Sequence, residues 1–462
     1  MLSMMMSAVI VMAVLMVMMA IRRAVATATL LASSALPFAA LASSALAAQT
    51  MELAPTPPPP APGVSAALDS ARAERGARMS VAILTYGPGD FVFEKFGHVA
   101  VALTDSSTGQ EIAFNWGMFD FNQPNFLARF LTGDTKYWMA GYRTADFNAA
   151  YMADNRTIRK QQLQLTAVQR GAIADFVSWN ALEANKYYRY DYYADNCATR
   201  VRDLLNWALA GQLDAPFRLP GGDRTWRSET ARITASDPLV YAGIQVALGR
   251  NADHRLTKSE ESFLPDLLAN HLAALTVSSA TGAPVKLVTS DSVLFTADRL
   301  PVPDQAPSRV LMALAIGTAL AALVLLLAGV RSVLARVTLG VFSALWFGVG
   351  GLLGAALLLA GTITKHSPYM GANLTVLQLH PLMLLAAVVI SMAAWRGTRS
   401  RVADGVSALV ALLSVVGLVL QLVPSLSQQS GVVLAVVVPV HIAFAVAVRR
   451  LPARAGTADA TP

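Results

Sequence analysis

The sequence predicts an α+β domain followed by an all-α membrane bundle, and three observations support this fold class. Hydrophobic residues make up 55% of the 462 positions and charged residues only 14%, which is more apolar than ordinary soluble proteins. The apolar residues are unevenly distributed, because residues 77–308 have a globular composition whereas the segment after Arg309 is almost entirely Ala, Leu, Val and Gly. Residues 77–308 also combine strand-like and helix-like patterns.

The N-terminal residues indicate export from the cytoplasm. Residues 1–48 predict a signal peptide or an N-terminal membrane segment, because an arginine pair precedes an apolar run that ends in a small-residue cleavage site at Ala45-Leu46-Ala47. The first 18 residues are compatible with an extra span or with a true start at Met19. Residues 49–76 include the run MELAPTPPPPAPGV and predict an extended, proline-rich linker.

Residues 309–450 contain five stretches that are long enough to cross a hydrocarbon core as helices, which takes about 20 residues. We place them near Val310–Val330, Val337–Thr364, Leu374–Trp395, Val406–Val423 and Val432–Val448. Arginines follow the first, third and fifth stretches, whereas the loop after the second has only Lys365 and the loop after the fourth has no charge. The positive-inside rule therefore predicts a multi-pass protein of the bacterial cytoplasmic (inner) membrane. It puts residues 77–308 on the periplasmic side and the tail, 451–462, in the cytoplasm.

The net charge of +7 does not indicate a nucleic-acid partner. Part of the excess comes from arginines in the predicted cytoplasmic loops, and residues 77–308 contain no basic low-complexity run. Membrane topology explains the charge, so we expect a membrane partner and no nucleic acid.

Cys197 is the single cysteine of the chain. Cysteines of an oxidising extracytoplasmic compartment usually form disulfides, and Cys197 has no partner within the chain. Asp195 and Asn196 are favourable helix-capping residues, which places Cys197 in the first turn of a helix. Such a position lowers a thiol pKa from about 8.5 to roughly 3.5–7.5. At this point a reactive thiol and a small buried hydrophobic residue remain equally open interpretations.

His98 is the histidine best placed to act as a base. It begins a predicted strand, HVAVAL, which is followed by the turn DSSTGQ and a return strand, EIAFNW. Folding this hairpin brings Asn115 or Trp116 opposite His98, and Asn115 could then orient the imidazole toward a thiol. A one-residue change of register would turn Asn115 to the other face, and a purely structural strand histidine remains an alternative.

Several segments together resemble the Lnb-type lipoprotein N-acyltransferase family. They are YGPG, FGH around His98, FNWGMFDF, NRTIRKQQLQLT and YYADNCATRVRDLL, with further likeness at residues 241–268 and 365–381. The order of a histidine strand, a second strand and an Asn-Cys pair at a helix start also resembles permuted papain-like thiol enzymes such as lecithin:retinol acyltransferase. The resemblance implies a permuted papain-like (NlpC/LRAT-like) extracytoplasmic domain followed by about five transmembrane helices.

The resemblance also implies a reaction. Cys197 would be the nucleophile and His98 its base. The resemblance does not identify the third member, for which we take Asn115 from the hairpin argument. A phospholipid would donate an acyl chain through a Cys197 thioester to the N-terminal amine of a diacylated bacterial lipoprotein. Backbone N–H groups at the helix start, the Asn196 side chain and Arg200 would support the developing charges.

Other residues are weaker candidates for contact with substrate. His366 and Asn373 lie in a predicted periplasmic loop and could mark a substrate path or could simply cap helix ends. Arg156 and Arg159, like Arg200, could bind phosphate or carboxylate groups, as could any surface arginine. In the aromatic segment 116–142, Tyr137 and Trp138 beside Lys136 are the best candidates for the membrane interface.

Two alternatives remain open from the sequence. The same Cys197 and His98 could serve a thiol hydrolase or amidase acting on cell-envelope lipid or peptide. The chain could also be a membrane-tethered sensor without enzymatic activity, with a structural Cys197. Because the sequence has no H-x-x-x-H pair and no second thiol, we expect neither a metal nor another cofactor.

Overall fold

The computed structural model describes residues 56–452, so the predicted signal segment 1–48 and the end of the tail from residue 453 lie outside the described residues. Residues 58–182 and 186–452 belong to one compact unit, and residues 56–57 and 183–185 are assigned to another.

A seven-stranded antiparallel sheet organises the first domain, in the order β6-β4-β3-β2-β1-β5-β9. A separate pair, β7 and β8, forms a small hairpin. The strands are β1 (Met79–Tyr86), β2 (His98–Asp105), β3 (Gln110–Met118), β4 (Lys136–Arg143), β5 (Ile158–Leu163), β6 (Tyr187–Arg189), β7 (Thr276–Ser278), β8 (Pro284–Lys286) and β9 (Val288–Phe295). The predicted hairpin around DSSTGQ is confirmed as β2 and β3.

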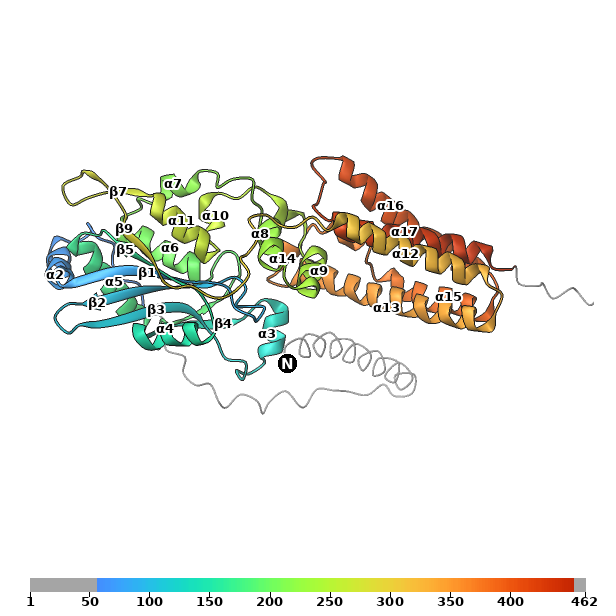
Figure 1. The fold of residues 1–462 in the computed structure, drawn as a ribbon, viewed down its shortest axis with the longest axis horizontal. Coiled ribbons are helices and arrows are strands. Elements are labelled where there is room, and N and C mark those ends of the chain that lie inside the picture. The colour runs from blue at the N-terminus through green and yellow to red at the C-terminus, as the bar shows by residue number, and fades with distance from the viewer. Residues whose placement is uncertain (1–55, 453–462) are drawn as a thin grey trace, which may run out of the picture. The chain divides into compact units, whose positions relative to one another are not determined.

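Helices cover both faces of the sheet (Figure 1). They are α2 (Ala66–Ala77), α3 (Phe126–Thr132), α4 (Thr144–Ala153), α5 (Ala167–Asn180), α6 (Cys197–Ala208), α7 (Asp214–Arg218), α8 (Trp226–Ile233), α9 (Pro238–Ala247), η1 (Arg250–Asp253), α10 (Lys258–Glu261) and α11 (Pro265–Ala274). Helices α5, α6 and α11 bury one face against side chains such as Val99 and Val101. Helix α4 packs Phe147 and Tyr151 on the other face, beside Tyr86.

The linker predicted for residues 49–76 ends earlier in the structure, at helix α2. Ser65 caps this helix, and the buried Arg72 contacts Asp175 of α5 at 2.8 Å. Gly76 and Gly171 allow the two helix backbones to approach closely, because a Cβ at either glycine would collide with the facing backbone. The proline-rich composition obscured a helix whose main partner lies about a hundred residues later in the chain.

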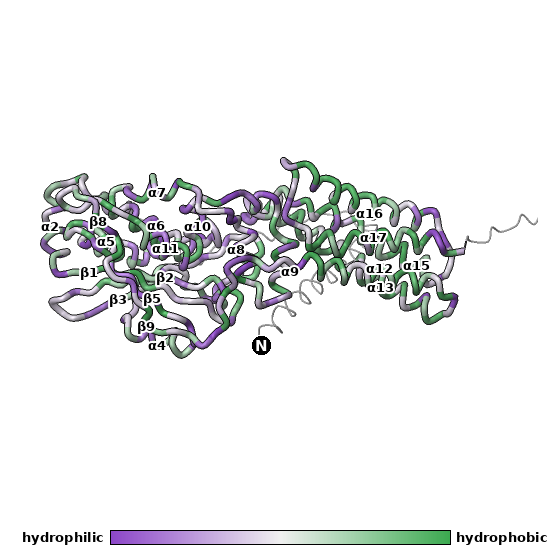
Figure 2. Tube along the Cα trace, turned by 45° about the horizontal axis from the view of Figure 1, so that its top comes forward, coloured by the Kyte–Doolittle hydropathy of each residue, from purple (hydrophilic) through white to green (hydrophobic). Residues whose placement is uncertain are grey.

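The membrane domain contains five apolar helices within the described residues, as predicted. Its elements are α12 (Val310–Gly329), α13 (Val333–Ile363), α14 (Ser367–Met370), η2 (Leu374–Leu377), α15 (Leu382–Arg396), α16 (Arg401–Val419), η3 (Leu420–Leu422) and α17 (Gly431–Arg450). Figure 2 shows nearly continuous hydrophobic colouring along these helices and mixed colouring in the first domain. The helix bounds agree with the predicted spans to within a few residues at most ends. The third span differs most, because α15 begins at Leu382, eight residues after the predicted Leu374, although the short η2 covers Leu374–Leu377. Helix α16 begins at Arg401, five residues before the predicted Val406.

Candidate active site

Cys197 is the first residue of helix α6, and the cap predicted from the sequence is present. The Asn196 side chain accepts hydrogen bonds from the backbone N–H groups of Ala198 and Thr199, at 2.9 and 3.0 Å. The Thr199 hydroxyl in turn accepts from the Asn196 backbone N–H, which completes a capping box. The thiol is free and buried, with 8% of the residue exposed. Its place at the helix start is therefore set by local hydrogen bonds.

His98 begins strand β2 and contacts Asn115 of strand β3. The two strands pair Ala100 with Asn115, so His98, two residues before Ala100, lies on the same face as Asn115. His98 Nε2 lies 3.1 Å from Asn115 Oδ1, which can only accept, so Nε2 carries the proton. Asn115 is fully buried, and its Nδ2 donates to the Ala140 carbonyl at 3.1 Å. The contact predicted between Asn115 and the imidazole is present, but Asn115 pairs with Ala100 and is a diagonal neighbour of His98, and Trp116 lies on the other face of the sheet.

Gly117 is the point where the imidazole approaches the thiol. His98 belongs to the face of the sheet covered by α4, whereas α6 covers the opposite face. A Cβ built on Gly117 would lie 3.3 Å from His98 Cε1, 3.9 Å from His98 Nδ1 and 3.9 Å from Cys197 Cβ. A side chain at Gly117 would thus meet both the His98 imidazole and Cys197, so both residues lie next to this glycine. Gly117 has φ +119°, a conformation that favours glycine.

Burial makes both groups neutral in this structure. It raises the pKa of the Cys197 thiol to about 11, although backbone N–H groups of Val99, Ala198 and Cys197 act in the opposite direction. It lowers the pKa of His98 to about 4, against the hydrogen bond to Asn115. The expected lowering of the thiol pKa by the helix N-terminus is therefore outweighed by desolvation.

Aromatic rings and one arginine surround His98 on the α4 face. The imidazole lies nearly parallel to the Tyr151 ring, with 10° between planes and 6.2 Å between centroids. Tyr151 also stacks on Tyr86 at 3.9 Å, and the Arg156 guanidinium lies 4.5 Å over the Tyr151 ring. A positive charge on Arg156 lowers the pKa of both Cys197 and His98, so the guanidinium is within electrostatic reach of the pair.

A thiol beside an asparagine-oriented imidazole is suited to covalent acyl chemistry. Residues 71–230 match the family description "Lnb N-terminal periplasmic domain", and residues 307–451 match "Lnb transmembrane domain". The chain belongs to the Lnb family. Membership indicates a multi-pass membrane enzyme of lipoprotein processing with an extracytoplasmic N-terminal domain. No curated protein and no solved structure showed a significant match.

In this Lnb family member, Asn196 and Arg200 are already engaged within the protein. Besides the cap, Asn196 Nδ2 donates to the carbonyls of Tyr192 and Phe263 at 3.0 and 2.9 Å. Arg200 makes two hydrogen bonds to the Asp195 carboxylate, at 2.6 and 2.8 Å, and covers the Tyr188 ring. The structure thus gives both residues a role in holding the loop before Cys197.

His366 and Asn373 lie in the connection between α13 and α15 and also make internal contacts. His366 Nε2 hydrogen-bonds the Phe130 carbonyl at 3.0 Å, and its ring stacks on Tyr192. Asn373 caps η2 and donates to the carbonyls of Val246 and Ala247. The structure brings His366 to the loop that precedes Cys197 and places Asn373 against the end of α9.

Sequence reasoning missed Gly117 and Tyr151. The sequence signal for Gly117 was its position two residues after Asn115 on the same strand, where a side chain would face His98. Tyr151 carried no usable signal, because its stacking on His98 depends on helix α4 crossing the sheet.

Proposed function

We propose that this protein is a cysteine-dependent acyltransferase of the bacterial inner membrane. It would move an acyl chain from a phospholipid, through a thioester on Cys197, to the N-terminal amine of a diacylated lipoprotein. The observation that carries the proposal is the meeting of Cys197 with the His98–Asn115 pair at Gly117. Membership of a family of lipoprotein processing supports the choice of acceptor.

In the first half of the reaction, His98 Nδ1 takes the thiol proton and the sulfur attacks an ester carbonyl of the phospholipid. The tetrahedral intermediate collapses, the C–O bond breaks, and His98 returns the proton to the leaving lyso-lipid oxygen. In the second half, the lipoprotein amine attacks the thioester and His98 accepts its proton. The C–S bond then breaks, an amide forms, and the proton returns to the Cys197 sulfur.

The neutral state of both groups suits this sequence of steps. A thiol with a pKa of about 11 beside an imidazole with a pKa of about 4 does not form a stable ion pair in the empty site. The proton would therefore move only as the sulfur attacks, which protects the thiol from oxidation between turnovers. The Cys197 backbone N–H, at the start of α6, is a suitable donor to the oxyanion.

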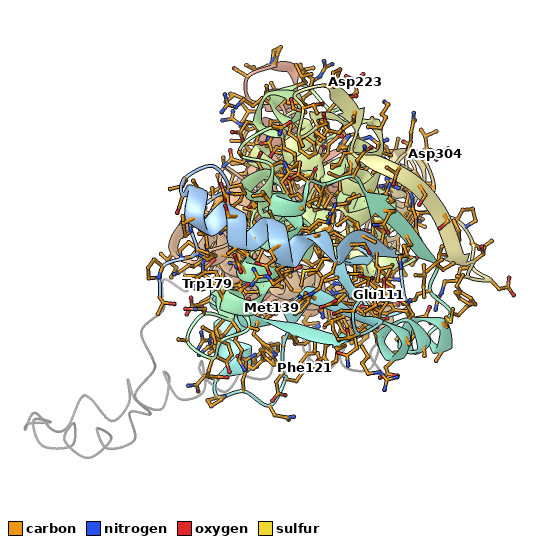
Figure 3. All side chains as sticks on the ribbon, turned by 90° about the vertical axis from the view of Figure 1, so that its left-hand side faces the viewer. Glu111, Phe121, Met139, Trp179, Asp223 and Asp304 are labelled. Carbon is orange, nitrogen blue, oxygen red and sulfur yellow. The ribbon has the colours of Figure 1, made fainter. Side chains whose placement is uncertain are left out.

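Exposed phenylalanines near the site support a lipid substrate. The loop before β2, the loop after β3 and helix α3 carry a set of contacting rings that we call the phenylalanine cluster: Phe91, Phe93, Phe119, Phe121, Phe126 and Phe130. Four of its members are exposed, with Phe121 at 54% and Phe130 at 53%. Figure 3 shows Phe121 at the margin of the first domain, away from its interior. Contiguous exposed rings of this kind are typical of lipid or protein contact surfaces.

The decisive experiment is mass spectrometry of a lipoprotein from cells that depend on this protein for lipoprotein maturation. Native protein should yield a third, amine-linked acyl chain, whereas Cys197→Ser and His98→Ala should not, at equal amounts in the membrane. A lipoprotein profile unchanged by Cys197→Ser would falsify the proposal. Release of free fatty acid without lipoprotein acylation would favour the thiol hydrolase instead.

A further inference from the structure

We propose that Arg156 forms a subsite for the phosphodiester of the acyl donor, so that the enzyme selects glycerophospholipids over neutral acylglycerols. This inference rests on the proposed function, because it concerns the donor of the same Cys197 site. It is carried by a buried guanidinium nitrogen that has no hydrogen-bond partner among the described residues.

Three arginines were candidates for anion binding, and the structure separates them. Arg159 makes two hydrogen bonds to Asp291 at 2.8 and 2.6 Å and a third to Asn270. Arg200 makes two hydrogen bonds to Asp195. Both guanidinium groups are thus neutralised by a close, two-point contact with one carboxylate, which leaves little capacity for an anionic ligand.

Arg156 differs from both in its partners. The residue is 4% exposed, its Nε donates to the Gly87 carbonyl at 2.9 Å, and its nearest carboxylate is Glu94, at 3.8 Å from Nη1. The Nη2 atom is buried and unpartnered within the described residues. An unsatisfied buried donor on a charged group is costly, so its retention indicates a ligand that supplies the missing acceptor.

The position of Arg156 fits the donor lipid. Its guanidinium stacks on Tyr151, whose ring lies parallel to His98, so the charge lies beside the catalytic pair without contacting Asn115. In a glycerophospholipid the ester carbonyls and the phosphate are separated by a few bonds of the glycerol. A carbonyl at Cys197 therefore brings a phosphate oxygen into the neighbourhood of Arg156. The guanidinium suits phosphate because it presents planar, paired donors.

The test uses the full chain in detergent, where Cys197 is the only thiol that can react. We would measure the rate of Cys197 alkylation by N-ethylmaleimide in the presence of di-O-hexyl glycerophosphoethanolamine or of di-O-hexyl glycerol. The ether linkages cannot acylate the thiol, so protection reports binding alone. The variants are Arg156→Gln, Arg156→Lys and, as a matched control, Arg159→Gln.

In the native protein and in Arg159→Gln, the ether phospholipid should protect Cys197 from alkylation better than the neutral ether lipid does. The concentration needed for half protection should be lower by roughly tenfold or more, as expected for a charge-assisted contact. Arg156→Gln should lose this preference, and Arg156→Lys should keep only part of it. Equal protection by both lipids in the native protein, or an undiminished preference in Arg156→Gln, would overturn the subsite. If Arg156→Gln does not fold, an undiminished preference in Arg156→Lys has the same consequence.

Two further outcomes distinguish a failure of the proposed acyltransferase function from a failure of the Arg156 subsite. An ester-linked phospholipid that protects Cys197 in an Arg156-dependent way but never acylates a lipoprotein would contradict the acyltransferase and leave the phosphate subsite standing. Acyl transfer with equal use of phospholipid and diacylglycerol would contradict the subsite and leave the acyltransferase standing.

Discussion

At Cys197, burial and the helix N-terminus act in opposite directions on the thiol. The backbone N–H groups favour a thiolate, but removal from water favours the neutral thiol by more, so the pKa rises. The same removal from water keeps His98 neutral. Cys197 and His98 are therefore a neutral thiol and a neutral imidazole near neutral pH, not an ion pair.

This pair predicts a stability maximum between about pH 6.5 and 9. His98 has a pKa of about 4 in the folded protein against 6.5 when unfolded, so its contribution is complete above pH 6.5 and is lost as pH falls toward 4. Cys197 has a pKa of about 11 against 9.0, so its contribution is complete below pH 9 and is lost as pH rises toward 11. Each loss amounts to roughly 3 kcal/mol.

Thermal unfolding of the detergent-solubilised protein from pH 4.5 to 10.5 would check both limbs. Cys197→Ala should flatten the alkaline limb and leave the acidic one, and His98→Ala should do the reverse. A Cys197→Ala profile that matches the native one above pH 9 would show that the thiol titrates at its ordinary pKa.

Gly117→Ala should lower the rate of acyl transfer about 10- to 100-fold. The new Cβ would lie 3.3 Å from His98 Cε1 and would displace the imidazole from Cys197, and such displacements cost that much in well-oriented reactions. Gly109→Ala is the matched control, because Gly109 also has positive φ (+69°) but has open space at the Cβ position. Both variants should lose stability from backbone strain, measured by thermal unfolding: about 1 kcal/mol in Gly109→Ala and more in Gly117→Ala, because φ +119° lies outside the left-handed region open to L residues. Equal activity of the two variants would contradict the geometry assigned to Gly117.

At the scale of elements, strands β2 and β3 place His98 and Asn115, and the segments beyond these strands carry the phenylalanine cluster. Phe93 lies in the loop that leads into β2 at His98, and Phe121 lies in the loop that leaves β3 after Gly117. The elements that position the imidazole therefore also present apolar rings to solvent. The predicted interfacial residues, Tyr137 and Trp138, are only partly exposed and pack against Tyr190 and Tyr187.

Replacing Phe93 and Phe121 together by serine should reduce acyl transfer from lipids in proteoliposomes by about tenfold or more. Each exposed ring that enters lipid contributes roughly 1.5–3 kcal/mol, and serine removes that contribution. Transfer from a short-chain phospholipid dispersed in detergent should change little, because the rings do not contact His98 or Cys197 in the described contacts. Val293→Ser, on the exposed edge strand β9, is the control. An equal loss with both donors would instead indicate damage to the site.

At the scale of the whole molecule, the connection between α13 and α15 contacts the loop that precedes Cys197. The Tyr369 hydroxyl of α14 donates to Asp191 Oδ1 at 2.8 Å in a buried contact. The same oxygen accepts from the backbone N–H groups of Tyr193 and Ala194, at 3.0 Å each. Asp191 and Asp195 also pair through their backbones, one residue before the cap of α6. The membrane domain therefore helps to hold the residues that position Cys197.

Tyr369→Phe should make Cys197 more reactive to N-ethylmaleimide and should lower the catalytic rate. The substitution removes a buried hydrogen bond to a carboxylate, worth about 1–3 kcal/mol, which corresponds to roughly 5- to 150-fold in opening of the loop. Tyr241→Phe removes a similar hydroxyl that donates to the Pro307 carbonyl, far from Asp191 in sequence, and should leave both readouts unchanged. Unaltered alkylation in Tyr369→Phe would show that the loop is held without this contact.

Much of the fold and part of the site were predictable from local patterns. The five spans, the β2–β3 hairpin and the start of α6 each depend on residues within about 30 positions of one another, so periodicity and capping residues reveal them. The prediction of an extended linker was wrong for residues 66–76, which belong to α2. This helix packs against Gly171 and Asp175 of α5, about a hundred residues later in the chain. The sequence suggested that the Asn196 side chain could stabilise an oxyanion. It could not reveal that this side chain donates to the carbonyl of Phe263, which is distant in the chain.

The sequence by itself determined the five apolar helices, the single thiol at a helix start and the histidine at the start of a strand, because each depends on residues close together in the chain. Only the tertiary structure decided the protonation state of the Cys197 thiol and which residues surround it. Burial, which sums over segments far apart in the chain, keeps Cys197 and His98 neutral. The packing of α4 and α6 on opposite faces of the sheet put His98 and Cys197 both next to Gly117. It also left the buried Arg156 Nη2 without a hydrogen-bond partner among residues 56–452.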